Sequence, residues 1–339
     1  MRLAHVLAAS AAFTGLLQAA TPAFAAEKLI ITTNVPPQHW ASTQGAEPFM
    51  ACVKKATNGD IDFSYFPGGQ IQNFNNSLDV VNNGLAQISY LVISALSGKF
   101  PINGIPLLPN MGTSVVEMTK ANRKVIDAEG PFKKEFADNK VRPLFINMFP
   151  PYQMILKSGA IEAPKDFQGK KILSGGSTMS FAIKSLGSSP VEIPVADMYM
   201  AVSQGTVDGV VLALASVKPY KLEEVAKSMT TNAHLGSASG IWAMDLATWN
   251  KMTPANQKAM NDCGLQTEEN IAKWVDDFTL KLQADLSGSG VKFYTLSNDA
   301  KAAFGKNLTA ASDDYVSRLA SRGAPAKAAL DMYLKALGR

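Results

Sequence analysis

The sequence predicts an α/β protein of two hinged lobes, each a mostly parallel sheet flanked by helices. Short β-rich runs and amphipathic helical stretches alternate along the chain, which favours parallel strands covered by helices. The 339 residues are also more than one hydrophobic core usually holds. A third observation is the helical stretch 254–286, whose length suits a helix that braces both lobes.

The first lobe is expected to open with a strand at 29–33, which ends at the turn 34–37. The Asn58-Gly59 and Pro67-Gly68-Gly69 breaks then separate the following elements. These elements are a helix near 45–57, a strand at 61–66, a helix at 75–82 and a strand at 88–93.

Two extended runs, 143–148 and 153–156, flank the segment 149–152, where we expect the first crossing between lobes. The second lobe then alternates helix and strand over 179–186, 190–193, 196–204 and 207–212. The chain is expected to return to the first lobe through two further runs, 229–234 and 240–244. The tail, 299–337, is mainly helical. The predicted boundaries are 26–148 plus 235–273 for the first lobe and 149–234 plus 274–339 for the second.

The N-terminus predicts export. Arg2 precedes an apolar run without acidic residues, and Ala23-Phe24-Ala25 places small residues before a cut near Ala25. The run is too short and too early for a membrane span, so residues 1–25 are expected to be a cleaved signal peptide and the mature protein to be periplasmic.

Composition excludes several partner classes. Apolar residues make up 47% of the chain and charged residues 18%, as in packed globular proteins. The net charge of +4 is small and evenly spread, so neither nucleic acid nor a membrane surface is an expected partner. We expect a monomer.

Two cysteines, Cys52 and Cys263, remain in the mature chain. In an oxidising compartment an even pair indicates a disulfide, which here would join distant segments. Two free buried thiols are equally compatible with the sequence, because geometry decides the pairing.

Catalytic and metal sites are not predicted. Beyond the signal peptide the only histidines are His39 and His234, and neither has a cysteine or carboxylate at metal-ligand spacing. The chain contains neither a G-x-S-x-G nucleophile turn nor a G-K-[ST] phosphate loop. We therefore expect no enzyme, no metal and no cofactor.

Residues 164–209 carry an ordered set of motifs. Phe167-Gln168-Gly169-Lys170-Lys171-Ile172 is followed by a helix containing Asp197, Tyr199 and Ala201, and then by Gly205 and Asp208-Gly209. Together with the earlier 105–109 segment, this order and spacing resembles the DctP-type solute-binding proteins of TRAP (tripartite ATP-independent periplasmic) transporters, over nearly the whole mature chain. The resemblance implies a periplasmic binding protein fold whose lobes close on a solute, and two TRAP membrane subunits as partners.

One position departs from the family pattern. The arginine that usually follows the Lys-Ile pair and grips a substrate carboxylate is Leu173 here. The residue after Asp-Gly is the apolar Val210, with Leu212 further along. Three alternatives stay open: the backbone N–H groups of 174–177, including Gly175 and Ser177, hold an anion; Arg142 or Arg123 reaches in; or the solute lacks a carboxylate and is a small amine, an aromatic or a neutral compound.

Aromatic residues near predicted strand ends support the last alternative, because they can stack on a ring or surround an amine. His39 also follows the first strand, where ligands bind in open α/β sheets. Asp208 or Glu192 could offer an amine a counter-charge. With Leu173 and the positions above, the candidate ligand-binding residues are His39, Trp40, Phe66, Tyr90, Phe149, Tyr152, Tyr199 and Trp242.

Other classes remain alternatives: the binding protein of an ATP-driven importer, an exported enzyme, and a receptor that signals to a membrane kinase. Neighbouring genes would distinguish the ATP-driven importer from a TRAP system, since a TRAP system has two integral membrane proteins and no ATPase.

Overall fold

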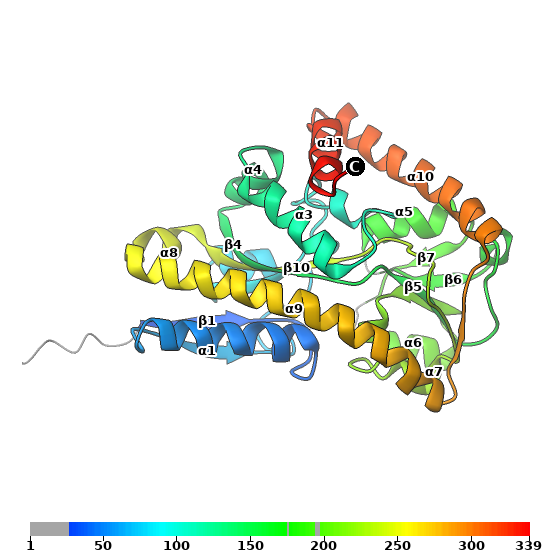
Figure 1. Ribbon diagram of the computed structural model, residues 1–339, viewed down its shortest axis with the longest axis horizontal. Coiled ribbons are helices and arrows are strands. Elements are labelled where there is room, and N and C mark those ends of the chain that lie inside the picture. Colours follow the sequence, from blue (N-terminus) through cyan, green and yellow to red (C-terminus); the bar gives the residue numbers. More distant parts are fainter. Residues whose placement is uncertain (1–26, 175, 194–196) are drawn as a thin grey trace, which may run out of the picture.

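The computed structural model describes residues 27–174, 176–193 and 197–339, and for Glu27 and Ser177 the backbone alone. The expected signal peptide and Gly175 lie outside this description. Two sheets form the two bodies of the molecule, and a long helix, α9 (Pro254–Gly288), runs along both of them (Figure 1).

The first sheet has the strand order β2-β1-β3-β10-β4. Only β10 is antiparallel to its neighbours, so the carboxyl ends of the other four strands meet the start of β10 at one edge. The strands are β1 (Glu27–Thr32), β2 (Ile61–Phe66), β3 (Ile88–Val92), β4 (Val141–Met148) and β10 (Ser239–Asp245).

The second sheet has the order β11-β9-β5-β8-β6-β7, and only β5 is antiparallel to its neighbours. Its strands are β5 (Gln153–Leu156), β6 (Lys171–Leu173), β7 (Ser189–Val191), β8 (Gly209–Leu212), β9 (Ser228–Thr230) and β11 (Lys292–Tyr294). The chain crosses between the sheets three times, from β4 to β5, from β9 to β10 and, through α8 and α9, from β10 to β11.

Helices cover both sheets. Those associated with the first sheet are α1 (Glu47–Ala56), α2 (Ser77–Asn82), α3 (Val115–Asp127), α4 (Pro131–Asp138) and α8 (Leu246–Lys251). Those of the second are α5 (Ser177–Ser185), α6 (Met198–Gln204) and α7 (Leu222–Val225). Short turns of helix are η1 (Ala41–Ala46), η2 (Ile105–Leu107), η3 (Pro164–Phe167) and η5 (Leu214–Ser216).

Side-chain caps explain where the long helices begin. The Ser114 hydroxyl accepts from the Glu117 N–H at the start of α3, and the Thr253 hydroxyl accepts from the Asn256 N–H at the start of α9. Pro254 follows Thr253 at the first helical position, where a missing N–H costs nothing.

The long helix α9 is fixed to the first sheet by buried charge. The Glu268 carboxylate accepts hydrogen bonds from the Arg123 guanidinium of α3 and from the Ile146 N–H of β4. About two turns further along α9, Asp276 accepts from the Val115 and Val116 N–H groups and so caps α3. Toward its end α9 packs on η5 and β11 of the second lobe. The predicted brace between lobes is therefore present.

The C-terminal helices divide between the lobes. Helix α10 (Asn298–Ser321) packs on α5, whereas α11 (Ala326–Ala336) returns to α3 and η2. The Tyr333 hydroxyl donates to the Met111 carbonyl there. We expected all of 274–339 in the second lobe, and α11 departs from that boundary because its buried face, with Tyr333, fits against the first.

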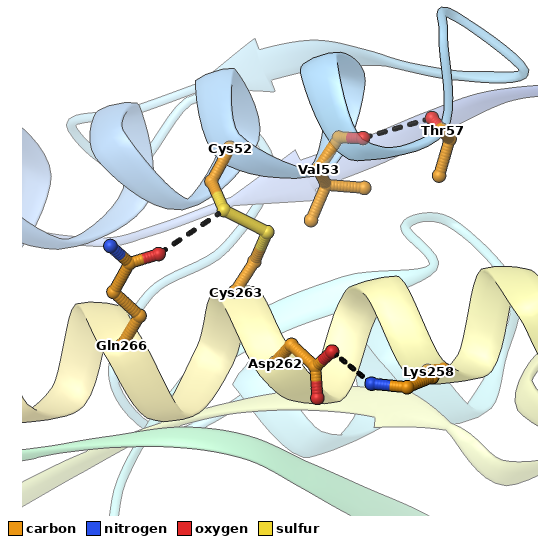
Figure 2. Close-up of a disulfide and its surroundings, with 7 residues drawn as sticks. All are labelled: Cys52, Val53, Thr57, Lys258, Asp262, Cys263 and Gln266. Atoms are coloured by element: carbon orange, nitrogen blue, oxygen red, sulfur yellow. Dashed lines mark hydrogen bonds and ion pairs between the residues drawn. A yellow bond between two sulfur atoms is a disulfide. The ribbon is translucent and has the colours of Figure 1, made fainter.

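A disulfide joins α1 to α9 (Figure 2). Cys52 and Cys263 are bonded, with their Cα atoms 5.7 Å apart and a separation of 211 positions in sequence. The Gln266 side-chain oxygen lies 3.7 Å from the Cys52 sulfur. The bond ties the N-terminal half of α9 to the first lobe.

Candidate functional site

The two lobes meet where the carboxyl ends of their strands face each other. Asn34 follows β1, Phe149 follows β4, and Ser216 and Tyr220 follow β8. Such edges are where ligands bind in open α/β sheets, because the connecting loops leave side chains free to converge. At this edge Gly176, at the start of α5, lies so close to the first lobe that a Cβ there would stand 2.4 Å from the Ser94 carbonyl oxygen.

Aromatic rings from both lobes fill this junction. The His39 ring centroid lies 5.0 Å from that of Trp40, 6.0 Å from Phe149 and 5.8 Å from Tyr220. Trp40 meets Phe149 edge-on at 4.8 Å, and Phe149 meets Tyr152 at 6.5 Å. We call these five residues the interlobe ring cluster.

His39 is held in one neutral tautomer. Its imidazole is completely buried, and burial lowers the pKa of His39 to about 3. Its Nδ1 accepts a hydrogen bond from the Ala41 N–H at 3.1 Å, so the single proton of the neutral ring is on Nε2. Within the described residues Nε2 has no acceptor, and His39 therefore offers an unused donor.

Tyrosines surround the same region. Burial raises the pKa of the Tyr90 phenol well above its usual range, and the nearby phenols of Tyr220, Tyr152 and Tyr65 raise it further. The pKa of Tyr152 is raised by burial and then by Tyr220. These mutual effects place phenols of both lobes close together, all of them uncharged at neutral pH.

Gly240 makes room for Tyr90. A Cβ at this glycine would lie 1.9 Å from the Tyr90 ring and hydroxyl, so a side chain on β10 would displace the ring. Tyr90 also packs on Trp242, with centroids 4.8 Å apart. The glycine therefore sets where one of the junction's phenols lies.

Polar side-chain atoms without a hydrogen-bond partner in the described part of the chain gather at this junction. An unpaired buried polar group costs about 1–3 kcal/mol, so a cluster of them indicates a place where a polar molecule binds. The cluster comprises atoms of Asn34, His39, Trp40, Tyr90, Thr178, Ser216, Ser237 and Ser239.

A groove of about 340 Å³ adjoins the cluster and shares Trp40 with it. Both lobes and α9 form its walls, and its one cationic side chain, Lys218, lies 3.4 Å from the Asp285 carboxylate. The other lining residues are Gln38, Thr43, Ala215, Pro219, Trp274 and Phe278.

Leu173 ends β6 and is 1% exposed. It pairs in register with Val191 of β7 and Val210 of β8, so the end of this sheet presents three apolar side chains in a row. Leu212, at the end of β8, is also buried and pairs with Gln153.

The start of α5 carries its own polar partners. The Gly176 N–H donates to the Ser174 hydroxyl, and that hydroxyl lies 2.8 Å from the Ser180 hydroxyl. Ser180 in turn donates to the Glu192 carboxylate at 2.7 Å. An acidic side chain of the protein thus already lies near this helix N-terminus, where an anion would otherwise be favoured.

No described arginine reaches the junction. Arg123 binds Glu268 and Asp127, Arg142 lies over the Trp249 ring and donates to Asn261, and Arg318 pairs with Asp314. The other two are exposed, Arg322 directly after α10 and Arg339 at the C-terminus. The described contacts do not support the alternative in which Arg123 or Arg142 replaces the missing arginine, because Arg123 is engaged with Glu268 and Asp127, and Arg142 with Asn261 and Trp249.

Apart from Leu173, Val210 and Leu212 at the strand ends described above, the predicted site residues divide into three groups. His39, Trp40, Phe149 and Tyr152 lie together, with Tyr90 beside them. Other candidates lie elsewhere: the Tyr199 hydroxyl donates to Glu224 on the surface, Trp242 donates to Asn147 within the first lobe, and Phe66 makes no ring contact with the described residues of the cluster. Gly175 and the Ser177 side chain lie outside the described residues.

The sequence pattern missed Tyr220, Asn34 and Ser216. Each follows the carboxyl end of a strand, which is the signal that could have identified them. Asp208 accepts a hydrogen bond from the Lys171 N–H between β8 and β6, a structural role rather than a counter-charge for a ligand.

The chain belongs to a known family. Residues 32–318 match the family of bacterial extracellular solute-binding proteins, family 7, the DctP family. The C4-dicarboxylate-binding periplasmic protein DctP of Rhodobacter capsulatus is 24% identical over 336 residues, which cover 93% of this chain and 95% of that protein. The predicted resemblance to DctP-type proteins of TRAP transporters is confirmed.

Solved structures share the two-lobed fold. A marine metagenome TRAP solute-binding protein specific for aromatic acids, in complex with metahydroxyphenylacetate, has a TM-score of 0.86 at 20% identity, covering 92% of this chain and 98% of that one. A TRAP protein of Bordetella bronchiseptica with bound mandelate has a TM-score of 0.83 at 21% identity, covering 92% and 99%. The predicted fold class is therefore confirmed.

The family consists of periplasmic transport proteins that bind small solutes and work with TRAP membrane components, and it is not a family of enzymes. None of the helices in the described ranges has the length and apolar character needed to cross a bilayer. Within the same ranges, histidine, cysteine and acidic side chains nowhere form a group of three suited to a metal ion.

Proposed function

We propose that this protein is the extracytoplasmic receptor of a TRAP transporter and that its solute, held between the lobes, carries no carboxylate. Family membership supports the receptor role. The observation that supports the solute class is electrostatic. The unpaired buried polar atoms of the junction belong to uncharged side chains, and Lys218 of the adjoining groove is partly exposed and lies beside Asp285.

A carboxylate enclosed at this junction would have no buried cation. Burial of an unpaired charge costs several kcal/mol, and the neutral donors of His39, Trp40 and Asn34 offset only part of that cost. The related proteins named above bind aromatic acids and mandelate, so the replacement of arginine by Leu173 would set this receptor apart from them.

The runner-up is an organic acid held by backbone N–H groups of 174–177. The Gly176 N–H is already used by Ser174, and Glu192 lies nearby through Ser180, which disfavours a second negative charge. This reading keeps one advantage, since a helix N-terminus attracts anions.

The test is a thermal-shift screen of mature protein with carboxylates, amines and uncharged ring compounds. A ligand at 100 times its dissociation constant adds about 2.7 kcal/mol to the free energy of unfolding, which is easily seen as a higher melting temperature. Strong stabilisation by C4-dicarboxylates would contradict the solute class. X-ray scattering that is identical with and without a stabilising solute would contradict capture by closure of the lobes.

Three further points belong to the same proposal. Residues 1–25 are a signal peptide, which N-terminal sequencing of the exported protein would reveal as a start at Ala26. The lobe boundaries follow the three crossings between the sheets, with α11 joined to the first lobe. The receptor delivers its solute to two TRAP membrane subunits, so transport in reconstituted vesicles should need this protein and no ATP.

A further inference from the structure

We infer that His39 determines specificity as a donor, and that the solute is an uncharged planar ring compound whose carbonyl-type oxygen accepts the His39 Nε2–H. The inference rests on the proposed function and deepens it by naming the chemistry that the site recognises. It depends on three observations about the junction: a donor of fixed direction, aromatic rings around it, and a complementary set of neutral polar groups.

The donor cannot reverse its role. The Ala41 N–H occupies Nδ1, so a shift to the other tautomer would oppose two N–H groups, and a flip of the ring would lose this hydrogen bond by placing Cδ2–H against the Ala41 N–H. A buried Nε2–H therefore selects an acceptor, and a ligand ammonium or amide nitrogen at that point would leave two donors face to face.

The surroundings favour a flat ring. The ring centroids of Trp40, Phe149 and Tyr220 all lie within 6.0 Å of that of His39, and the three residues come from both lobes. Aromatic rings that meet at about 4.5–7 Å gain energy from stacked or edge-on contact beyond the area they bury. An aromatic or lactam ring inserted among them would contact both lobes at once, and such contacts exist only when the lobes are closed.

The remaining unpaired groups can both donate and accept. The hydroxyls of Tyr90, Ser216 and Ser239 and the side-chain amide of Asn34 have no partner among the residues that the structure describes. A primary amide or lactam, which carries an acceptor and a donor side by side, satisfies such a set without any charge. A carboxylate offers acceptors only and brings a charge that no buried cation balances.

The experiment uses two matched pairs of probes: benzamide with benzoate, and nicotinamide with nicotinate. Within each pair the ring is the same and only the amide and the carboxylate differ. Calorimetry and thermal shift on the mature protein should show that each amide binds at least tenfold more tightly than its acid. Tighter binding of either acid, or no binding of both amides at millimolar concentration, would overturn the inference.

Two variants isolate the role of His39. His39→Phe keeps a ring and removes the donor, and it should weaken amide binding about tenfold, the equivalent of about 1.4 kcal/mol. His39→Gln keeps an N–H near the Nε2 position and should lose less. Equal amide affinity of the wild-type protein and His39→Phe would overturn the donor role. Circular dichroism and melting temperature establish that each variant is folded, and His234→Phe, in the second lobe, serves as the matched substitution that should leave amide affinity unchanged.

These outcomes separate the inference from the proposed function. If benzoate binds tightly and X-ray scattering shows that the protein becomes more compact, the receptor role stands and the inference of an uncharged solute is contradicted. If neither the acids nor the amides bind, and no compound of the wider screen makes the protein more compact, the proposed receptor role is contradicted as well.

Discussion

The imidazole of His39 in the first lobe lies 5.8 Å, centroid to centroid, from the phenol ring of Tyr220 in the second. Neither residue is near the other in sequence, and they meet only because the loops after β1 and β8 face each other. Burial of the His39 ring at this contact lowers its pKa, so we expect its protonation to respond to opening of the lobes.

Solute affinity should therefore fall at acidic pH. Burial in the closed form lowers the pKa of His39 from its ordinary value near 6.5 to about 3, whereas an open form returns the ring to water. A lowered pKa means that the closed form is fully favoured above pH 6.5 and loses its advantage as the pH falls below that value. Affinity measured by calorimetry should drop up to tenfold per pH unit below about 6.

A matched pair of variants isolates this effect. Tyr220, the titratable ring that contacts His39 from the second lobe, stays protonated over this range because burial raises its pKa. His39→Gln should flatten the pH profile of solute affinity, and His234→Gln should leave it unchanged. A wild-type affinity that is constant from pH 7 to pH 5 would rule out this linkage.

Leu173→Arg should weaken binding of the native solute. The side chain is 1% exposed between Val191 and Val210, so a guanidinium there must either move into the junction or remain buried without a partner. Entry into the junction would crowd the solute and supply the cation that a carboxylate needs, so benzoate affinity should rise while benzamide affinity falls. Leu173→Met, which conserves volume, is the control. Unchanged affinities for both probes would place residue 173 outside the site.

Glu268→Gln should lower the free energy of unfolding by about 3–5 kcal/mol, because it leaves the Arg123 guanidinium without its buried partner. The matched control is Glu269→Gln, one residue along α9, where the carboxylate is exposed and pairs with Lys273. Urea denaturation should show a clear loss for the first variant and almost none for the second. Equal losses would mean that helix propensity, rather than the buried pair, determines the effect.

Reduction of the Cys52–Cys263 bond should lower the free energy of unfolding by about 2–5 kcal/mol, because the bond limits the unfolded chain over a long loop. Denaturation with and without reductant measures this loss. The double variant Cys52→Ala, Cys263→Ala should unfold at the same denaturant concentration in both conditions. A reductant effect that persists in the double variant would show that the bond is not its cause.

Much of the fold could be predicted from local patterns. The strands at 61–66 and 153–156 and the long helix from Pro254 were expected at or near their observed bounds, because alternation, turn residues and caps are local in sequence. The placement of α11 could not be predicted, since it depends on which distant surface accepts Tyr333.

The site was predicted in part. His39 and Phe149 follow strand ends and were expected there, but Tyr199 looked equally suitable in sequence and instead pairs with Glu224 at the surface. Tyr220 was missed because two turns of chain separate it from the end of β8, so its approach to His39 is a property of the tertiary structure. The tautomer of His39 likewise depends on the Ala41 N–H, which no sequence pattern specifies.

A single α9 of 35 residues, about 52 Å long at 1.5 Å per residue, is fastened at one end by a covalent bond and extends to the other body. Any change in the angle between the bodies must flex this rod or slide its free end over η5 and β11. We therefore expect elastic recoil of α9 to oppose closure, so that the dwell time of a captured molecule depends on helix stiffness as well as on its own contacts.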